Sequence, residues 1–218
     1  MPGEAAPHGR YLTVARNAEA EIEVKRSRFL CTIERVDDEA AARAVVDRLR
    51  KQHWDARHTC SAFVLGPRGE VQRSSDDGEP SGTAGAPMLE VLRGHDLSDV
   101  VAVVTRWFGG TLLGAGGLVR AYGDAVRAGL AEAGQRERLL VAEYEVAVGH
   151  GEAGRVESEL RTRGFDVIDA AYAEQVTLRL GVLPEAVDRL TAVLAELTSG
   201  GAEAKELRRV WRDQSASR

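Results

Sequence analysis

In the first half of the chain, some segments have a hydrophobic residue at every second position, which is typical of strands. In other segments hydrophobic residues recur about every 3.6 positions, which is typical of helices. The expected strands cover residues 21–24, 29–36 and 58–65, a short partner near Val71, and 100–107. The expected helices run from Asp37 or Asp38 to about Trp54, from about Pro87 to Gly94, and from about Gly117 to Ala133. The segment 100–107 is apolar as far as Val104, which favours a central strand covered on both faces.

A boundary is expected at residues 134–138, which are polar and show no periodicity. Beyond them the pattern predicts, in order, a strand over 143–148, a helix over 151–163, strands over 166–172 and 175–183, a helix over 184–197 and a strand over 205–211. This βαββαβ order is that of the ferredoxin-like fold. We therefore expect an α+β protein with a loose tail over 1–18, a two-layer α/β domain over 19–134, and a ferredoxin-like domain over 138–218.

Composition narrows the classes of function. The chain has 218 residues, enough for two small domains, and its 44% hydrophobic and 29% charged residues are those of an ordinary globular protein. No apolar run is long enough to span a membrane, and the N-terminus lacks the apolar core of a signal peptide, so we expect a cytoplasmic protein without a membrane partner. The net charge of −5 excludes a globally basic surface, so any nucleic-acid site must be a local patch.

The two cysteines, Cys31 and Cys60, form no CxxC motif and are too few for a disulfide framework. Both lie in apolar runs, so we expect reduced thiols that serve as small core residues. His58 lies two residues before Cys60 on an expected strand, hence on the same face. Their side chains would be too far apart for a catalytic dyad. His58 is kept as a candidate polar binding residue, and no catalytic residue is assigned.

An acidic motif, RSSDDGEPSGTAGAPML at residues 73–89, sets Asp76, Asp77 and Glu79 among glycines and the hydroxyls of Ser81 and Thr83. This composition favours a loop. The carboxylates permit a Mg²⁺ site, but their spacing matches no known metal loop or hydrolase pattern, and a turn or capping role is favoured instead. We therefore assign no metal ligand and no cofactor. The hydroxyls lack the elbow motif of a serine hydrolase.

A Gly-rich motif, VVTRWFGGTLLGAGGLVRAYG at residues 103–123, leads from the expected central strand into a helix. Backbone N–H groups at such a helix start can face an anion. The alternative is that the glycines only let the helix pack tightly against the strand. The motif lacks the spacing of a dinucleotide-binding fingerprint and of a Walker loop. The candidate anion- or RNA-binding residues are Arg106, Gly109, Gly110, Gly114, Gly116, Gly117 and Arg120.

Two arginines flank these glycines: Arg106 ends the strand, and Arg120 falls in the first turn of the expected helix. A phosphate would suit this position, because guanidinium groups and a helix N-terminus both attract anions. Equally, either arginine could pair with Asp76, Asp77 or Glu79 and so bring the two motifs together.

These motifs carry a resemblance. SRFL (27–30), DARHTCSAFVLG (55–66), SSDDGEPSGTAGAPML (74–89) and the Gly-rich motif are similar to those of the IMPACT/YigZ family. The resemblance implies an N-terminal domain like a ribosomal-protein domain and domain four of elongation factor G, and a C-terminal domain like the ferredoxin-like domain five of that factor. Eukaryotic relatives regulate translation through an additional N-terminal domain that we do not expect here, so their partner is not carried over.

The leading hypothesis is a non-enzymatic binding protein, a possible regulator of translation, whose partner is RNA, the ribosome or a protein of the translation machinery. The rival hypothesis is an enzyme that processes small molecules or phosphoesters with the acidic motif and Mg²⁺. Arginines and glycines favour the first, and three clustered carboxylates favour the second.

Overall fold

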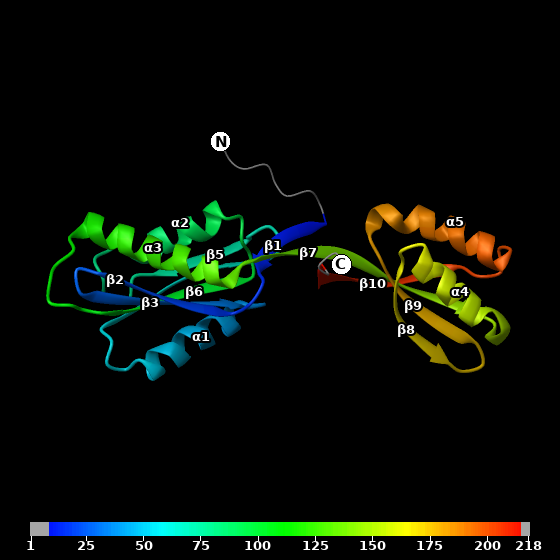
Figure 1. Cartoon of the computed structure of the whole chain (residues 1–218), viewed down its shortest axis with the longest axis horizontal. Coiled ribbons are helices and arrows are strands. Elements are labelled where there is room, and N and C mark those ends of the chain that lie inside the picture. Colours follow the sequence, from blue (N-terminus) through cyan, green and yellow to red (C-terminus); the bar gives the residue numbers. More distant parts are fainter. Residues whose placement is uncertain (1–8, 215–218) are drawn as a thin grey trace. The chain divides into compact units, whose positions relative to one another are not determined.

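The computed structural model describes residues 9–214, and the chain divides into two units, Met1–Glu137 and Arg138–Arg218 (Figure 1). Each unit combines a largely antiparallel sheet with helices, in agreement with the expected α+β class. None of the described helices is both long and apolar enough to cross a membrane.

The first unit is built on a five-stranded sheet with the order β2-β3-β6-β4-β5. Its strands are β1 (Arg10–Val14), β2 (Ala18–Val24), β3 (Ser27–Arg35), β4 (His58–Leu65), β5 (Val71–Ser75) and β6 (Val100–Trp107), of which β1 lies outside this sheet. Its helices are α1 (Glu39–Gln52), α2 (Gly85–Gly94) and α3 (Ala115–Ala133). Helix α1 covers one face and α2 and α3 cover the other, while β2 and β5 form the two edges (Figure 1).

Strand β6 is the centre of this unit, as its apolar sequence predicts. Val100, Ala102 and Val104 point into the core beneath α2 and α3, whereas Val101 and Val103 point into the core beneath α1. Because successive strand residues face opposite sides, both faces of β6 must be apolar. This burial holds the end of β6, from which the Gly-rich motif continues, in a fixed position.

The helix starts follow local sequence signals. Asp38, one of the two expected caps, accepts a hydrogen bond from the Ala41 backbone N–H at 2.7 Å. Helices α2 and α3 each begin two residues before the expected start, at Gly85 and Ala115. As a result Arg120 lies in the second turn of α3 rather than in its first.

The expectation of a loose tail as far as residue 18 is wrong in its described part. Residues 10–14 form β1, and β2 begins at Ala18. Tyr11 and Val14 are buried, and the Ala15 N–H donates to the Gly134 carbonyl at 3.1 Å. Five residues are too few to show a strand period clearly, which is why the sequence did not reveal β1. Residues 1–8 lie outside the described part.

The second unit has the expected βαββαβ order and a core of its own. Its elements are β7 (Gln135–Val148), α4 (His150–Thr162), β8 (Asp166–Tyr172), β9 (Val176–Val182), a 3₁₀ turn η1 (Pro184–Ala186), α5 (Val187–Thr198) and β10 (Ala204–Asp213). Its sheet has the order β10-β7-β9-β8, and the buried residues of α4 and α5 pack with those of β7, β8 and β9. The division between the two units, after Glu137, falls within residues 134–138, but these residues are not free of secondary structure, because β7 begins at Gln135.

Candidate functional site

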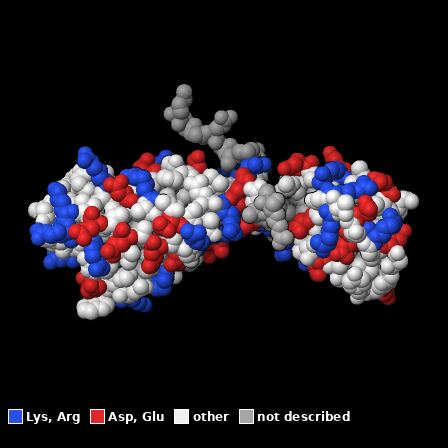
Figure 2. All heavy atoms as spheres, viewed as in Figure 1, with Lys and Arg blue, Asp and Glu red and all other residues white. Residues whose placement is uncertain are grey.

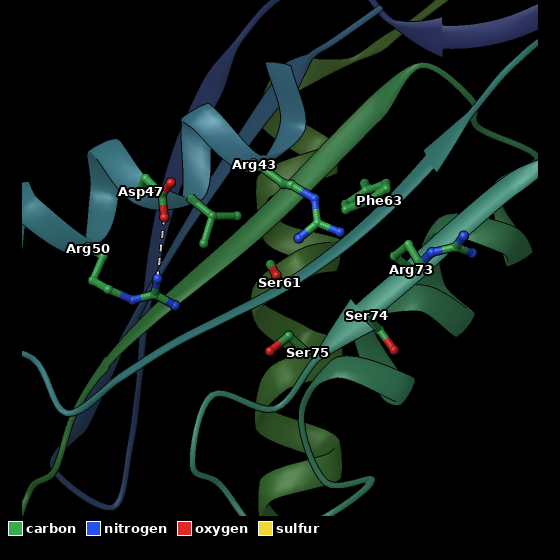
Figure 3. A pocket seen from close by; sticks show the side chains of 9 residues that line it. Arg43, Asp47, Arg50, Ser61, Phe63, Arg73, Ser74 and Ser75 are labelled. Carbon is green, nitrogen blue, oxygen red and sulfur yellow. Dashed lines mark hydrogen bonds and ion pairs between the residues drawn. The ribbon is translucent and has the colours of Figure 1, made fainter. Parts of the chain in front are cut away.

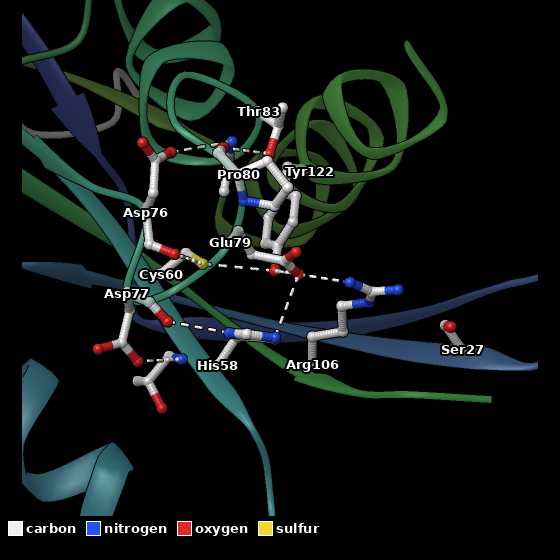
Figure 4. Close-up of polar contacts among 12 residues, drawn as sticks. Ser27, His58, Cys60, Asp76, Asp77, Glu79, Pro80, Thr83, Arg106 and Tyr122 are labelled. Atoms are coloured by element: carbon white, nitrogen blue, oxygen red, sulfur yellow. Dashed lines mark hydrogen bonds and ion pairs between the residues drawn. The ribbon is translucent and has the colours of Figure 1, made fainter. Parts of the chain in front are cut away.

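The acidic loop (residues 76–84) lies against the start of β4. The Asp77 carboxylate accepts the Thr59 backbone N–H at 2.7 Å, and the Asp77 carbonyl oxygen lies 2.9 Å from His58 Nδ1. The Cys60 thiol donates to the Asp76 carbonyl at 3.0 Å (Figure 4). The first three residues of β4 therefore hold the loop, and His58 contacts it as a polar neighbour.

Asp76 caps the start of α2 from a distance in sequence. Its carboxylate accepts backbone N–H groups from Gly82 at 2.8 Å, Ala84 at 3.1 Å and Gly85 at 2.8 Å. Partial burial by itself would raise the pKa of Asp76, but these three hydrogen bonds outweigh it and hold the pKa below its usual range. The capping role expected for the acidic motif is thus found at Asp76.

Asp77 ties the loop to α1. Beside its bond to Thr59, its carboxylate forms an ion pair with Arg50 at 3.0 Å. Asp77 has a φ of 41°, a left-handed conformation that aspartate tolerates better than most residues. Both oxygens of Asp77 are therefore engaged by protein donors.

Glu79 is the buried end of the acidic loop, with 3% of its side chain exposed. One of its oxygens accepts hydrogen bonds from Arg106, whose side chain is 6% exposed, and from the Tyr122 hydroxyl at 2.7 Å (Figure 4). His58 Nε2 lies 3.9 Å from the same oxygen. A buried charge persists in a core only when it is paired in this way.

Of the two roles predicted for Arg106, phosphate binding and pairing with an acidic residue, the structure shows the pairing. Arg106 closes the acidic motif onto the Gly-rich motif, and its guanidinium lies 5.3 Å from the centre of the Phe29 ring. Its Nε is buried and has no hydrogen-bond partner in the described part of the chain. Removal of Arg106 would leave the buried Glu79 without its cation, so this arginine contributes to the fold itself.

The two thiols and Tyr122 have raised pKa values. Burial raises the pKa of Cys60 to about 12, despite the 3.3 Å hydrogen bond to the Tyr122 oxygen. Burial likewise raises the pKa of Tyr122, and it raises the pKa of Cys31. Both cysteines are free and buried, as expected of core residues. Neither thiol is therefore ionised to a useful degree near neutral pH.

The two hydroxyl candidates differ in their surroundings. The Thr83 hydroxyl is part of the turn before α2, where it donates to the Pro80 carbonyl at 2.6 Å. Ser81 is exposed. Within residues 9–214, no group of three or more His, Cys, Asp or Glu side chains is arranged to hold a metal ion.

The first glycine of the Gly-rich loop (residues 108–114) is Gly109, and packing explains it. A Cβ at Gly109 would lie 2.0 Å from backbone atoms of Arg26, in the turn between β2 and β3. The Gly109 N–H donates to the Ser27 hydroxyl at 3.1 Å. Of the two alternatives for the glycines, tight packing therefore holds at this position.

The later glycines of the motif are open. Gly110 and Gly114 have φ of 83° and 73°, and a Cβ at either, or at Gly116, would meet nothing within 4 Å. Gly114 caps α3 without any side-chain hydrogen bond. A Cβ at Gly117 would lie 3.0 Å from the Leu113 side chain. At the start of α3 the backbone is thus accessible, as anion binding requires.

One end of the first unit collects exposed apolar and basic side chains around this loop. The register pairs Arg28 of β3 with Trp107 of β6, and His58 of β4 with Arg106, so the neighbouring turns share this end. We call it the end surface, and it comprises Lys25, Arg26, Trp54, Arg57, Phe108, Leu112 and Arg120. Lys and Arg side chains are visible at the left end of this unit in Figure 2.

The apolar members of the end surface are well exposed, Trp54 and Leu112 to 83% each. The helix was expected to extend to about Trp54, but α1 ends at Gln52 and leaves Trp54 in the following turn. Four cations here make no ion pair with any described residue, namely Lys25, Arg26, Arg57 and Arg120. The sequence analysis did not select Trp54, Arg26 or Arg57 as candidate binding residues, although they lie in the turns that precede β3 and β4.

Comparisons with known proteins match both units. The sequence profile of the Impact N-terminal domain matches residues 25–130, and that of a domain of unknown function matches residues 146–200. The chain is 43% identical to the IMPACT family member YvyE of Bacillus subtilis over 90% of both proteins. It is 37% identical to the IMPACT family member YigZ of Escherichia coli, over 83% of this chain and 90% of that protein. A crystal structure of a hypothetical protein is 34% identical, with a TM-score of 0.62, over 93% of this chain and 99% of that one.

Proposed function

The chain belongs to the IMPACT family, and from that premise we propose that it is a non-enzymatic protein that binds RNA or the ribosome through the end surface. The observation that carries the proposal is the meeting of unpaired cations with exposed apolar side chains around an accessible helix start. Cations without carboxylate partners are free to neutralise phosphates, and exposed aromatic rings offer stacking surfaces to bases.

Within this proposal, Arg120 and the open glycines contact phosphate. Arg120 is exposed in the second turn of α3, and Gly114 and Gly116 leave the backbone around the first turn uncovered. Arg106 acts indirectly, since its ion pair with Glu79 anchors the strand from which the Gly-rich loop emerges. Arg26 supports the loop by donating to the Thr111 hydroxyl at 3.0 Å.

The net charge of −5 gives the proposal a consequence for specificity. A chain with an overall negative charge is repelled by nucleic acid everywhere except at a local basic patch. We expect a single, oriented mode of contact rather than general adhesion to RNA. A role in regulating translation would follow if the contacted RNA is ribosomal.

We also propose finer fold assignments. The sheet order β10-β7-β9-β8, with both helices packed in the same core, supports a ferredoxin-like second unit. The first unit, one sheet between one helix and two, is proposed to resemble domain four of elongation factor G. That pairing of folds is compatible with a ribosomal partner, although fold alone does not establish function.

The rival hypothesis, an enzyme that uses the acidic motif with Mg²⁺, is less favoured by the geometry. Asp76, Asp77 and Glu79 each already accept hydrogen bonds or ion pairs from protein donors. A metal would have to displace those donors, and Asp76 would have to release the start of α2. We therefore retain this hypothesis only as the outcome to be expected if binding tests fail.

The test is co-sedimentation with ribosomes and titration of RNA at several salt concentrations. We expect binding at low salt that is released at high salt. The variant Arg57→Ala/Arg120→Ala should bind more weakly, and its log–log salt slope should flatten by roughly 0.7–0.9 for each phosphate that is no longer neutralised. Arg93→Ala, which removes an exposed arginine of α2 already paired with Glu90, is the matched control.

Both outcomes are informative. A folded double variant with unchanged affinity and slope would remove the end surface from the proposal. Absence of any binding by the unmodified protein would favour the enzymatic hypothesis. Thermal melts of each variant separate a binding defect from unfolding.

A further inference from the structure

A polar cleft lies on the α1 face of the sheet in the first unit, between α1 and the strands β4 and β5. Its volume is about 300 Å³, and it is lined by Arg43, Val46, Asp47, Arg50, Ser61, Phe63, Arg73, Ser74 and Ser75 (Figure 3). The buried Glu79 and Tyr122 belong to the face covered by α2 and α3, so this cleft lies on the opposite face of the sheet from them, although its Arg50 also pairs with Asp77 of the acidic loop.

The fold explains why these side chains converge. Strand register pairs Ser61 with Ser75 and Phe63 with Arg73, so all four lie on the face that α1 covers only partly. From the helix, Arg43 and Arg50 are seven residues apart and hence point to the same side. In Figure 3 both guanidinium groups extend from α1 toward β4.

Two of the three arginines that line the cleft have carboxylate partners in the protein. Arg43 pairs with Glu39, and Arg50 pairs with Asp47 and Asp77. The hydrogen bond from Arg43, together with the charges of Arg43 and Arg73, holds the pKa of the Glu39 carboxyl below its usual range, although partial desolvation opposes it.

Arg73 is the third arginine of the cleft, and it has no ion-pair partner in the described part of the chain. Among residues 9–214, its guanidinium donates one hydrogen bond, to the neighbouring Gln72 carbonyl at 2.9 Å, and forms no ion pair. A guanidinium with free donors in a cleft that two further arginines also line favours an anion there.

Ser61 adds a hydroxyl to the wall of the cleft. The residue is 7% exposed, and its hydroxyl makes no hydrogen bond to any described residue. The hydroxyl oxygen is not one of the buried side-chain atoms that lack a partner, so it opens to the cleft. There it can donate to an oxygen atom of a ligand.

We propose that this cleft binds a small phosphomonoester, with its phosphate held by Arg73, Arg43 and the Ser61 hydroxyl. Most of the polar groups here are hydrogen-bond donors, which match the oxygen-rich dianion. Phe63 and Val46 form an apolar wall for the organic part of the ligand. A volume of about 300 Å³ corresponds to the small end of metabolite sites.

The proposal is tested on the full chain with phenyl phosphate as the probe. Calorimetry and the amide chemical shifts of Ser61 and Ser75 should report saturable binding, and uncharged phenol should not bind. Arg73→Ala should weaken the affinity by about tenfold or more, since it removes charge-assisted hydrogen bonds. Arg93→Ala is the control for loss of an exposed arginine elsewhere and should leave the affinity unchanged.

Ser61→Ala is a second variant that does not endanger the fold, since it deletes a hydroxyl that makes no hydrogen bond to any described residue. It should weaken phenyl phosphate binding about three- to tenfold while leaving or raising the melting temperature. The proposal is overturned if phenyl phosphate produces no saturable shift up to about 10 mM, if Arg73→Ala binds as the unmodified protein does, or if an RNA oligonucleotide shifts these amides and phenyl phosphate does not.

Discussion

The acidic loop and the Gly-rich loop are equally conspicuous in the sequence, but the fold uses them in opposite ways. In the acidic loop all three carboxylates have protein partners, and Glu79 is buried with Arg106. In the Gly-rich loop only Gly109 is tightly packed, and Gly110 and Gly114 border open space. One region is closed by internal contacts, and the other presents backbone to the solvent.

The difference shows that a motif can be rich in one kind of residue for two different reasons. The acidic loop concentrates polar residues because a buried network needs every donor and acceptor matched. The Gly-rich loop concentrates glycines because the chain must approach the β2–β3 turn at one point and stay uncovered at others. Substitutions in the closed region should therefore cost stability, whereas those in the open region should mainly affect binding.

The largest effect is expected for Glu79→Ala, which leaves Arg106 buried without its partner. We expect a loss of about 3–5 kcal/mol in the free energy of unfolding, measured by chemical denaturation. Glu90→Ala removes an exposed glutamate paired with Arg93 and should change stability by no more than about 0.5 kcal/mol. Equal effects of the two variants would show that the acidic loop is not closed.

Asp76→Ala should cost about 2 kcal/mol, because three backbone N–H groups at the start of α2 lose their acceptor. The pH dependence has a defined sign. The folded-state pKa of Asp76 is lowered, so its contribution is present above the unfolded pKa and lost as the pH falls through the folded pKa. Denaturation curves between neutral and acidic pH should therefore show a smaller acid destabilisation for Asp76→Asn than for the unmodified chain, and identical curves would contradict the role.

Gly109→Ala tests the one closed position of the Gly-rich loop. The added methyl group would overlap backbone atoms of Arg26, so we expect a loss of about 1–3 kcal/mol. Gly110→Ala meets no atoms but must adopt a positive φ, which costs roughly 1 kcal/mol. Thermal melts that rank Gly110→Ala as the more damaging variant would reverse the assignment of the two glycines.

The smallest effect is expected for Gly116→Ala, and its sign is opposite. Gly116 lies in the first turn of α3 with free space around it, so alanine should stabilise the helix by about 0.5–1 kcal/mol. If this more stable variant binds RNA less tightly, the uncovered backbone contributes to binding. If its melting temperature falls, the space around Gly116 is not open.

Much of the fold was predictable because its signals are local. The apolar run of β6, the Asp38 cap and the alternation in β4 each depend on a few neighbouring residues. Strand β1 and the start of β7 were not predicted, since their pairing partners are far away in sequence and their own residues are few or polar. Such strands are defined by tertiary contacts rather than by their own pattern.

The candidate site was only partly predictable for a related reason. From the sequence, an ion pair between Arg106 and the acidic motif was one of two alternatives. This ion pair forms because Glu79 is buried and hydrogen-bonded to Tyr122, which no local sequence pattern reveals. The unpaired state of Arg120 and the exposure of Trp54 likewise follow from where the helices begin and end. Residue types identified the candidates, and three-dimensional packing assigned their roles.

The edges of the first sheet bear on how the protein behaves at high concentration. Edge strand β2 carries Glu19, Glu21 and Glu23, all exposed, on the same side of the strand. If two copies met at these edges, glutamates would face glutamates across the new pairing. Unpaired edges otherwise template aggregation, and like charges along them are a recognised protection. The exposed glutamates of β2 therefore oppose edge-to-edge association of copies of this chain through the sheet.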